Sequence, residues 1–322
     1  MPTGSKRVLR DGAVSTGKPA MFLHAVVARL RGALTIGAYK GAARLAGLLS
    51  PLAADKTARV LGRALQKAMK SKRLMVVSHQ RRLSPELLTT QAIDRRVDAT
   101  FDSYAQYWVS MFRLQTQSRE EIEATIRVDG AQHIDDALAL GNGAIMAMPH
   151  VGAWDHGGAW VAGRWPISVV AERLEPPALF EWFCRQRAAT GMTVVPLDAG
   201  AGAPLMAALR RNEVIGLLCD RDIAGGGIPV TFFGSPTTMP AGPAMFALRT
   251  GAKILPNAVY QTPNGTAHGV IRPPIEFVRS GTLRADIVEL TQLLATELEG
   301  LIRAAPHQWH VLQPHWISDR PK

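Results

Sequence analysis

Short apolar segments alternate with helical segments along the second half of the chain. The apolar segments are bounded by turn residues, as expected for buried strands, and occupy residues 144–148, 167–171, 193–197, 214–219 and 253–259. Apolar positions at helical spacing occupy residues 177–190, 203–212, 240–250 and 285–303. Because strands and helices alternate, the pattern predicts an α/β fold in which an open sheet has helices on its faces.

The first half of the chain has only helical spacing. Residues 1–20 are rich in Gly, Ser, Thr and Lys and are expected to be disordered. Residues 21–72 are expected to form amphipathic helices that break near Ser50-Pro51, and residues 85–140 are also expected to be helical. Aromatic residues in the latter segment recur at spacings of three and four, which is typical of a buried helix face. They are Phe101, Tyr104, Tyr107, Trp108 and Phe112.

Basic side chains are concentrated in the first quarter of the chain. Residues 1–82 contain 17 Lys or Arg and only two acidic residues, whereas residues 83–322 contain 20 Lys or Arg and 24 Asp or Glu. A basic segment attracts phosphate in nucleic acid, in anionic lipid or on a ligand. We therefore divide the chain into residues 1–20, a basic amphipathic helical region at 21–82 and a main domain at 83–322.

Composition and charge exclude some classes of protein and leave others open. Hydrophobic residues make up 47% of the 322, enough for a substantial core, and two cysteines cannot form a disulfide framework. The basic helices are either an ordinary solvated face or helices that lie on a membrane surface. A nucleic-acid binder is disfavoured, because the segment lacks a recognisable module and interleaved stacking aromatics. We find no secretory signal and no spanning apolar stretch, so the expected location is cytosolic, at a membrane surface.

The most informative polar residues follow the predicted strand at 144–148. His150 comes after Pro149 at the carboxyl end of this strand, where open α/β folds bind their ligands. Within one helix the side chains of His150 and Asp155 would diverge by about 140°, so they meet only if His150 precedes the helix. A histidine oriented by a carboxylate can remove a proton from a substrate hydroxyl. The structural alternative is that Asp155 only stabilises the start of the helix.

A second polar cluster follows the predicted strand at 214–219. Asp220, Arg221 and Asp222 come directly after it, so one carboxylate could orient the base or hold an acceptor. Arg221 could meet developing negative charge or a phosphate. Glu172 follows the strand at 167–171 in the same way. A solvated loop with a salt bridge is the simpler alternative for this cluster.

A metal site is a further possibility that the sequence disfavours. His150, Asp155 and His156 are all of types that ligate metals, but adjacent residues of a helix point to different faces. No His-Glu-x-x-His motif or cysteine pair supports such a site. We therefore expect no metal ion here.

With these residues in view, the sequence resembles the bacterial acyltransferases that carry an H-x4-D motif, the lipid A lauroyl acyltransferase-like superfamily. It is most similar to the phosphatidylinositol mannoside acyltransferases of that superfamily. The similarity runs in order through roughly residues 100–318. The matching stretches are residues 104–108, 112–114, 149–155 and 171–176, Arg187 with Gly191, and residues 221–222, 232–234, 239–244 and 309–316. Asp220 departs from the pattern, in which Glu precedes Arg-Asp.

The resemblance implies a three-layer α/β/α acyltransferase fold, with a central mixed sheet flanked by helices and the basic helical region as an N-terminal extension. It implies a hydrophobic acyl pocket that meets a surface groove. The implied reaction transfers a long, palmitoyl-like chain from acyl-CoA to the 6-hydroxyl of a mannose of a phosphatidylinositol mannoside. His150 falls on the catalytic histidine and Asp155 on the motif acid, while Glu172 and Arg187 fall on polar groove positions.

We expect His150 to act as general base, with Asp155 or Asp220 orienting its ring and Arg221 or backbone N–H groups stabilising the oxyanion. Asp222 is expected to bind substrate. Acyl-CoA is then a co-substrate, and no bound cofactor, metal or acyl-enzyme is needed. The expected partners are acyl-CoA, a mannosylated phosphatidylinositol and the anionic cytoplasmic face of the plasma membrane. A lipid A-type or other glycolipid acyltransferase and a non-catalytic peripheral membrane protein remain as alternatives.

Overall fold

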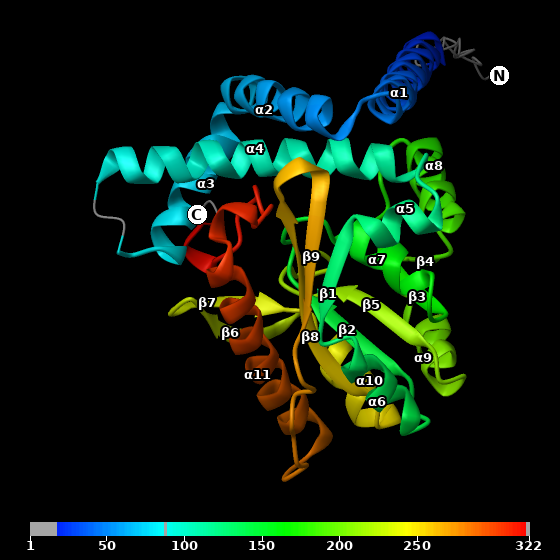
Figure 1. Cartoon of the computed structure of the whole chain (residues 1–322), viewed down its shortest axis with the longest axis vertical. Helices are drawn as coiled ribbons and strands as arrows, with labels where there is room; N and C mark the ends of the chain where they lie inside the picture. Colours follow the sequence, from blue (N-terminus) through cyan, green and yellow to red (C-terminus); the bar gives the residue numbers. More distant parts are fainter. Residues whose placement is uncertain (1–17, 87–88, 320–322) are drawn as a thin grey trace, which may run out of the picture.

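A computed structural model describes residues 18–86 and 89–319 as a sheet covered by helices on both faces, with further helices across one end of its strands (Figure 1). The expectation of disorder for the first residues of the chain falls mostly on residues 1–17, which lie outside the described residues. The three-layer α/β arrangement confirms the predicted fold class.

The central sheet has seven strands in the order β1-β9-β8-β2-β5-β3-β4. Strands β8, β2, β5, β3 and β4 run parallel, while β9 is antiparallel to β8 and β1 is parallel to β9, so the sheet is mixed. The bounds are β1 Ile126–Asp129, β2 Ala144–Met148, β3 Ile167–Ala171, β4 Thr193–Pro196, β5 Val214–Leu218, β8 Lys253–Thr262 and β9 Thr266–Ile271. A separate hairpin pairs β6 (Ile228–Phe232) with β7 (Ser235–Met239).

Two hydrophobic clusters hold helices against the two faces of the sheet. Alternate strand residues face opposite ways, so Met146 packs with α6 and α7, whereas Ile145 and Ile215 pack with α9, α10 and α11. The helices are α6 Gln132–Ala139, α7 Trp154–Ala162, α9 Gly202–Arg210, α10 Gly242–Thr250 and α11 Leu283–Ala304. Between β3 and β4 lies α8, Pro177–Ala189.

The N-terminal helices lie at the end of the sheet where the parallel strands finish. They are α1 Lys18–Gly47, α2 Pro51–Ala68, α3 Lys70–Leu83, α4 Thr90–Leu114 and the short α5 Arg119–Ala124. Helix α2 packs on α4 through Ala54, Ala58 and Gly62, which share one face at a spacing of four. A side chain at Gly62 would collide with the backbone of Asp102, so the two helices approach closely there. The turn between β8 and β9 contacts α2, so this helix layer sits beside the carboxyl ends of the parallel strands.

The structure confirms most of the elements predicted from sequence. All five predicted strands and the four helices of the second half are present, and the predicted helix break is real, since Ser50 caps α2 and Pro51 is its first residue. Residues 85–140 are largely helical, as predicted, in α4, α5 and α6, but β1 lies inside that segment as an edge strand paired with β9. Strands β6, β7 and β9 were also not predicted.

Candidate active site

His150 lies just beyond the end of β2, in a short connection to α7. The connection bends at Gly152, which has a φ of +63°, and a side chain there would collide with the carbonyl oxygen of Val259. The amide of Ala153 donates to this same carbonyl at 2.7 Å. The connection is therefore fixed against β8, and His150 is held before the helix, as predicted, with Asp155 in the first turn of α7.

The imidazole of His150 is paired with Asp220, which follows β5. Nδ1 of His150 lies 2.6 Å from Oδ1 of Asp220, and the backbone N–H of His150 donates to Oδ2 at 2.9 Å. Because β2 and β5 are adjacent and parallel, their carboxyl ends bring the two residues together. The Asp220 side chain is fully buried, while the His150 side chain is 14% exposed. The ring is thus held through Nδ1, which leaves Nε2 for chemistry.

Asp220 is kept ionised by its neighbours. Burial alone would raise its pKa, but the proximity of His150 and the hydrogen bonds from His150 and Trp309 outweigh burial, so the pKa lies well below the usual value. The indole N–H of Trp309 donates to Oδ2 of Asp220 at 2.7 Å. An ionised carboxylate only accepts hydrogen bonds, so Nδ1 of His150 carries the hydrogen and a neutral ring has its lone pair on Nε2.

Asp155 has different partners. Its two oxygens accept from Nε and Nη2 of Arg187 at 2.7 and 3.1 Å, and Oδ2 also accepts from the hydroxyl of Tyr107 at 2.7 Å. The Tyr107 ring stacks on Trp154 with centroids 4.0 Å apart. Helices α4, α7 and α8 are thereby joined by one buried ion pair and one hydrogen bond to the same carboxylate.

The charges of this second cluster are mutually stabilised. Burial lowers the pKa of Arg187, but Asp155 and Tyr107 outweigh burial and raise it above its usual value. Burial and the neighbouring Asp155 raise the pKa of Tyr107, so its hydroxyl stays protonated and donates. Of the two carboxylates predicted to orient His150, the structure therefore brings Asp220 to the ring, whereas Asp155 binds Arg187.

The remaining predicted residues line a groove beside His150. Nη1 of Arg221 lies 4.0 Å from Oε2 of Glu172, and both side chains reach the groove. Asp222 accepts from the backbone N–H of Gly227 at 2.9 Å and from the hydroxyl of Thr238 at 3.0 Å, so it also fixes the loop that follows β5. The structure thus gathers all seven predicted site residues around the carboxyl ends of β2, β3 and β5.

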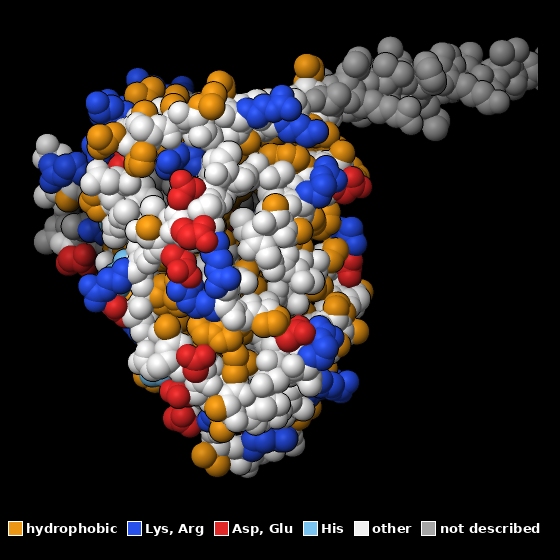
Figure 2. All heavy atoms as spheres, turned by 45° about the vertical axis from the view of Figure 1, so that its right-hand side comes forward, with side chains coloured by type: hydrophobic (Ala, Val, Ile, Leu, Met, Phe, Trp, Pro, Cys, Tyr) orange, Lys and Arg blue, Asp and Glu red, His pale blue; other side chains and the backbone are white. Residues whose placement is uncertain are grey.

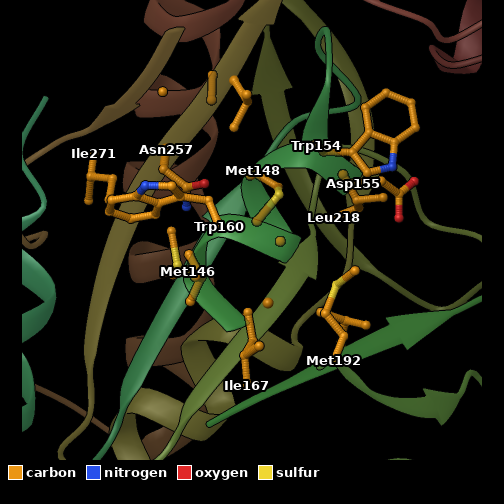
Figure 3. A pocket seen from close by; sticks show the side chains of 18 of the residues that line it. Met146, Met148, Trp154, Asp155, Trp160, Ile167, Met192, Leu218, Asn257 and Ile271 are labelled. Atoms are coloured by element: carbon orange, nitrogen blue, oxygen red, sulfur yellow. The ribbon is translucent and has the colours of Figure 1, made fainter. Parts of the chain in front are cut away.

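A mostly apolar pocket lies between α7 and the sheet (Figure 3). Its empty space is about 740 Å³, counted together with the solvent at its opening. Trp154 and Asp155 lie at one end of the pocket and Ile271 at the other, with Met146 and Ile167 on the sheet between them. Gly216 contributes no side chain to this wall, so β5 leaves open space at the centre of the sheet.

The groove lies on the opposite face of the sheet, over α9 and α10. It holds about 1360 Å³, including its open side, and combines the polar residues above with apolar ones such as Leu205 and Phe246. Trp154 and Arg187 line both the pocket and the groove. The two spaces therefore meet beside His150, where the strands end.

Neither a metal cluster nor a spanning helix is found in residues 18–86 and 89–319. No three His, Cys, Asp or Glu side chains there are arranged to hold a metal ion. His156 instead contacts the Thr125 hydroxyl at 3.2 Å. Within the same ranges, no helix combines the length and the apolar character needed to cross a membrane.

Sequence analysis missed the roles of two aromatic residues. Tyr107 was predicted as core, and it is buried, but its hydroxyl also holds Asp155. Trp309 was noted only as part of a matching stretch, and it contacts Asp220 across 89 positions of sequence. Its place beside a carboxylate depends on the folded path of the C-terminal segment, for which the local sequence has no signal.

Comparison with known proteins identifies the family of the chain. The sequence model of the family described as bacterial lipid A biosynthesis acyltransferase matches residues 32–318. Proteins named phosphatidylinositol mannoside acyltransferase from two strains of Mycobacterium tuberculosis are 39% identical over 232 residues, which are 69% of this chain and 70% of theirs. One of the same name from Mycolicibacterium smegmatis is 37% identical over 236 residues, 70% of this chain and 74% of its own.

Proposed function

The chain belongs to the bacterial lipid A biosynthesis acyltransferase family, and from this premise we propose that it transfers a long acyl chain from acyl-CoA to a mannose of a phosphatidylinositol mannoside. An acyltransferase acting on glycolipids follows from the family and the relatives. The donor, the 6-hydroxyl of the mannose and the mechanism are our proposal. It rests on one observation above all, the buried His150–Asp220 pair at the point where an apolar pocket meets a polar groove.

In the proposed mechanism, Nε2 of His150 removes the proton of the sugar hydroxyl as its oxygen attacks the thioester carbonyl. Asp220 holds the ring through Nδ1 and stabilises the imidazolium that forms. The tetrahedral intermediate then expels the CoA thiolate, which takes the proton from His150. One C–O bond forms, one C–S bond breaks and the proton moves from the sugar hydroxyl to the thiol through His150, so no acyl-enzyme is needed.

Negative charge that develops on the carbonyl oxygen has two candidate partners. Helix α7 begins four residues after His150. The N–H groups of His156 and Gly157 donate to the carbonyl of Ala153, but those of Trp154 and Asp155 precede the first helical hydrogen bonds. Arg221 lines the groove on the other side of the strand ends. Either group could stabilise the oxyanion without moving during the reaction.

The pocket between α7 and the sheet suits the acyl chain. Its walls are mainly aliphatic, with sulfur-containing side chains such as Met146 and Met192 that adapt to a flexible chain. Trp154 and Asp155 line the end of the pocket close to the general base, since the Trp154 and His150 rings lie 5.6 Å apart between centroids. We propose that the chain enters there and runs along the wall formed by β5, past Gly216.

The groove suits the polar parts of both substrates. Glu172 and Arg221 can accept and donate hydrogen bonds to sugar hydroxyls, and Arg221 can also bind a phosphate. The apolar part of the groove, beside Phe246, leaves room for an aliphatic part of a substrate. A lipid A-type acceptor would use the same chemistry, and the names of the most similar relatives favour the mannoside.

We further propose that α1 and α2 bind the cytoplasmic face of the plasma membrane. Large apolar side chains on these helices and in the turn between them are exposed, namely Leu34, Leu45, Leu48, Leu52 and Val60. Basic residues are exposed beside them, namely Lys40, Arg44, Lys56, Arg59, Arg63 and Lys67. Figure 2 shows basic and hydrophobic side chains together along this rim of the molecule. Such a surface suits an anionic bilayer, and it lies at the same end of the sheet as His150.

Thiol release from palmitoyl-CoA tests the reaction directly. The purified protein should release CoA thiol only when phosphatidylinositol mannoside is added, and mass spectrometry of the lipid should find one added acyl chain on a mannose. His150→Ala should lower turnover by about 10²–10⁴, the usual worth of a positioned general base. Acylation of lipid A precursors but not of the mannoside would select the alternative acceptor, and transfer with neither would contradict the proposal.

The path of the acyl chain can be tested at Gly216. A Cβ added there would lie 3.2 Å from Cγ1 of Val169 and 3.4 Å from Cδ1 of Ile167. The valine side chain of Gly216→Val should therefore fit only by occupying space inside the pocket. We expect its kcat/KM for palmitoyl-CoA to fall by at least about tenfold relative to a short-chain acyl-CoA. Because each protein is measured with both donors, the ratio of the two kcat/KM values contains its own control. A ratio equal to that of the wild type would place the acyl chain elsewhere.

Membrane binding can be tested by charge reversal. The variant Lys56→Glu/Arg59→Glu/Arg63→Glu should bind vesicles of anionic phospholipid less tightly, and wild-type binding should weaken as salt rises. A control variant reverses three exposed arginines far from α2, Arg210, Arg249 and Arg284, and so has the same net charge. Equal loss of binding in both variants would mean that net charge, and not the α2 surface, attracts the bilayer.

A further inference from the structure

The C-terminal segment, residues 306–319, lies against the connection that holds the general base. Trp309 pairs with Val151 in an antiparallel bridge, and the backbone N–H of His310 donates to the carbonyl of His150 at 2.8 Å. The backbone N–H of Gly152 donates to the carbonyl of Gln308 at 3.0 Å. The segment therefore runs beside the whole connection that holds His150.

Three N–H groups fix the carboxylate of Asp220 from two sides. Oδ1 accepts from Nδ1 of His150, and Oδ2 accepts from the backbone of His150 and from Nε1 of Trp309. Trp309 is 1% exposed and Asp220 is fully buried, so water cannot replace the indole. Without this N–H, Oδ2 would keep one donor and the carboxylate could rotate about its Cβ–Cγ bond.

We propose that Trp309 is a positioning residue for the general base, whose indole N–H fixes the Asp220 carboxylate so that Oδ1 stays on Nδ1 of His150. This inference rests on the proposed function, because it assigns Trp309 a part in the same proton transfer. Trp309 touches neither the substrate groove nor the apolar pocket and acts only through Asp220. Its effect is therefore on turnover and not on substrate binding.

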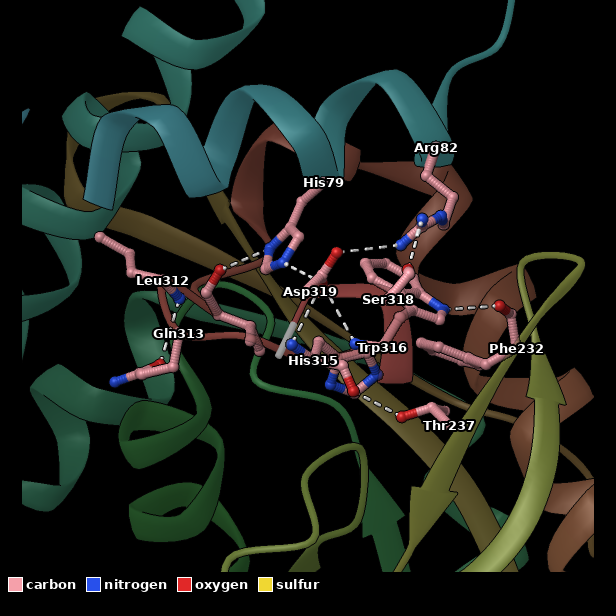
Figure 4. A network of polar contacts seen from close by, with 11 residues as sticks. His79, Arg82, Phe232, Thr237, Leu312, Gln313, His315, Trp316, Ser318 and Asp319 are labelled. Atoms are coloured by element: carbon pink, nitrogen blue, oxygen red, sulfur yellow. Dashed lines mark hydrogen bonds and ion pairs between the residues drawn. The ribbon is translucent and has the colours of Figure 1, made fainter. Parts of the chain in front are cut away.

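The position of Trp309 is itself secured by the rest of the segment (Figure 4). Nδ1 of His79, on α3, donates to the carbonyl of Val311 at 3.1 Å. Asp319 accepts from the backbone N–H of Trp316 at 3.1 Å, and Arg82 lies over the Trp316 ring at 4.2 Å. Because both ends of the segment are held, Trp309 has little freedom to follow a moving carboxylate.

The other titratable groups near the pair do not compete for this carboxylate. Burial lowers the pKa of His310 to about 3 and that of His315 to about 4, so both rings are neutral near neutral pH. Burial raises the pKa of the Cys219 thiol, which also stays neutral. Arg221 follows Asp220 in the chain but is aligned with Glu172. Trp309 thus remains the side-chain donor that holds Oδ2.

Trp316 offers a matched control for an indole in the same segment. It is 0% exposed, and its Nε1 donates to the carbonyl of Phe232 at 2.8 Å, away from Asp220. Replacing either tryptophan by 3-benzothienylalanine removes the N–H and keeps the ring shape. Trp309→Phe and Trp316→Phe provide a second pair made from natural residues. Comparison of the two positions separates loss of a buried hydrogen bond from loss of the Asp220 contact.

The first readout is the tautomer of His150, measured by ¹⁵N NMR on histidine-labelled protein without substrate. The wild type and the Trp316 variants should have hydrogen on Nδ1 alone, whereas the Trp309 variants should have a mixture of tautomers. The second readout is steady-state transfer. The Trp309 variants should lose roughly 10- to 100-fold in kcat with KM unchanged, the worth of a hydrogen bond to a charged group. The Trp316 variants should keep kcat within about threefold.

A folded Trp309 variant with one His150 tautomer and normal kcat would overturn the inference, and so would equal losses of kcat at both positions. The NMR readout needs no turnover, so the two proposals can fail separately. If the wild type transfers no acyl group but the tautomer changes only in the Trp309 variants, the proposed function fails and the positioning role of Trp309 stands.

Discussion

Asp155 and Asp220 are two buried carboxylates at the end of the sheet where the parallel strands finish, yet their surroundings differ. Asp220 accepts hydrogen bonds from an imidazole and an indole, which stabilise its negative charge without neutralising it. Asp155 meets the guanidinium of Arg187 in a two-point ion pair, reinforced by Tyr107. One carboxylate therefore stays available to the ring that gains and loses a proton in the proposed mechanism, while the other is neutralised by an arginine.

This difference indicates a division of labour at the ends of the strands. In the proposed mechanism the Asp220 pair takes part in proton transfer, because its partner His150 lines the groove. The Asp155 cluster joins α4, α7 and α8 around the place where the pocket and the groove meet. Changes at Asp220 should thus alter turnover first, and changes at Asp155 should alter stability and the shape of the pocket mouth.

The largest expected effect is at Asp220. Asp220→Asn keeps the size of the side chain but removes the charge that fixes the Nδ1–H tautomer, so kcat should fall by about 10²–10⁴. Asp155→Asn, the matched change at the other carboxylate, should lower kcat less and the unfolding midpoint more. Steady-state assays and thermal unfolding of both variants check this. Equal losses of kcat at equal stability would mean that the two carboxylates share one role.

The next effect concerns the ion pair of Asp155. Removal of one partner leaves a buried charge unpaired, so Arg187→Met and Asp155→Leu should each lower the free energy of unfolding by about 3–5 kcal/mol. The double variant should lose clearly less than the sum of the two, because neither charge is then left alone. Urea unfolding of the four proteins gives this coupling. Additive losses would show that Asp155 and Arg187 do not stabilise each other.

A smaller effect is expected at Tyr107. Its hydroxyl donates to an ionised carboxylate, and hydrogen bonds to charged groups contribute about 1.5–3 kcal/mol. Tyr107→Phe should lower the free energy of unfolding by that amount. Tyr104→Phe, one helical turn earlier, is the control, because its hydroxyl interacts with Trp108 and not with a carboxylate. If both variants lose the same stability, the Tyr107–Asp155 bond contributes nothing of its own.

Local sequence pattern predicted the central strands and the end of the sheet that carries the site. The buried parallel strands read as continuous apolar runs, so β2 and β5, and with them His150 and Asp220, were identifiable. Strand β9 was missed because it contains His268 and Gly269 and exists as the hairpin partner of β8. The Asn264-Gly265 pair, a common hairpin turn, was a signal that could have found it.

The choice between the two carboxylates could not be predicted from pattern. Both aspartates come after a buried strand, at the end of the sheet where the parallel strands finish. What separates them is Arg187 on α8 and Trp309 on the C-terminal segment, partners 32 and 89 positions away in sequence. Such contacts depend on how whole helices pack on the sheet, and one sequence contains no periodic signal for that.

A buried histidine should make the stability of the site sensitive to acid. His310 packs against Tyr107 and Trp154, and burial lowers its pKa from 6.5 to about 3, whereas Tyr107 and Arg187 do not titrate between these values. In this window the unfolded chain binds a proton at His310 that the folded protein does not, so stability is lost as pH falls below about 6.5. His310→Gln should flatten the pH dependence of unfolding by at most about 1.4 kcal/mol per pH unit, whereas Tyr107→Phe should leave the slope unchanged. Urea unfolding across this range measures both slopes, and a parallel change in the two variants would mean that the proton taken up at His310 is not what makes the slope steep.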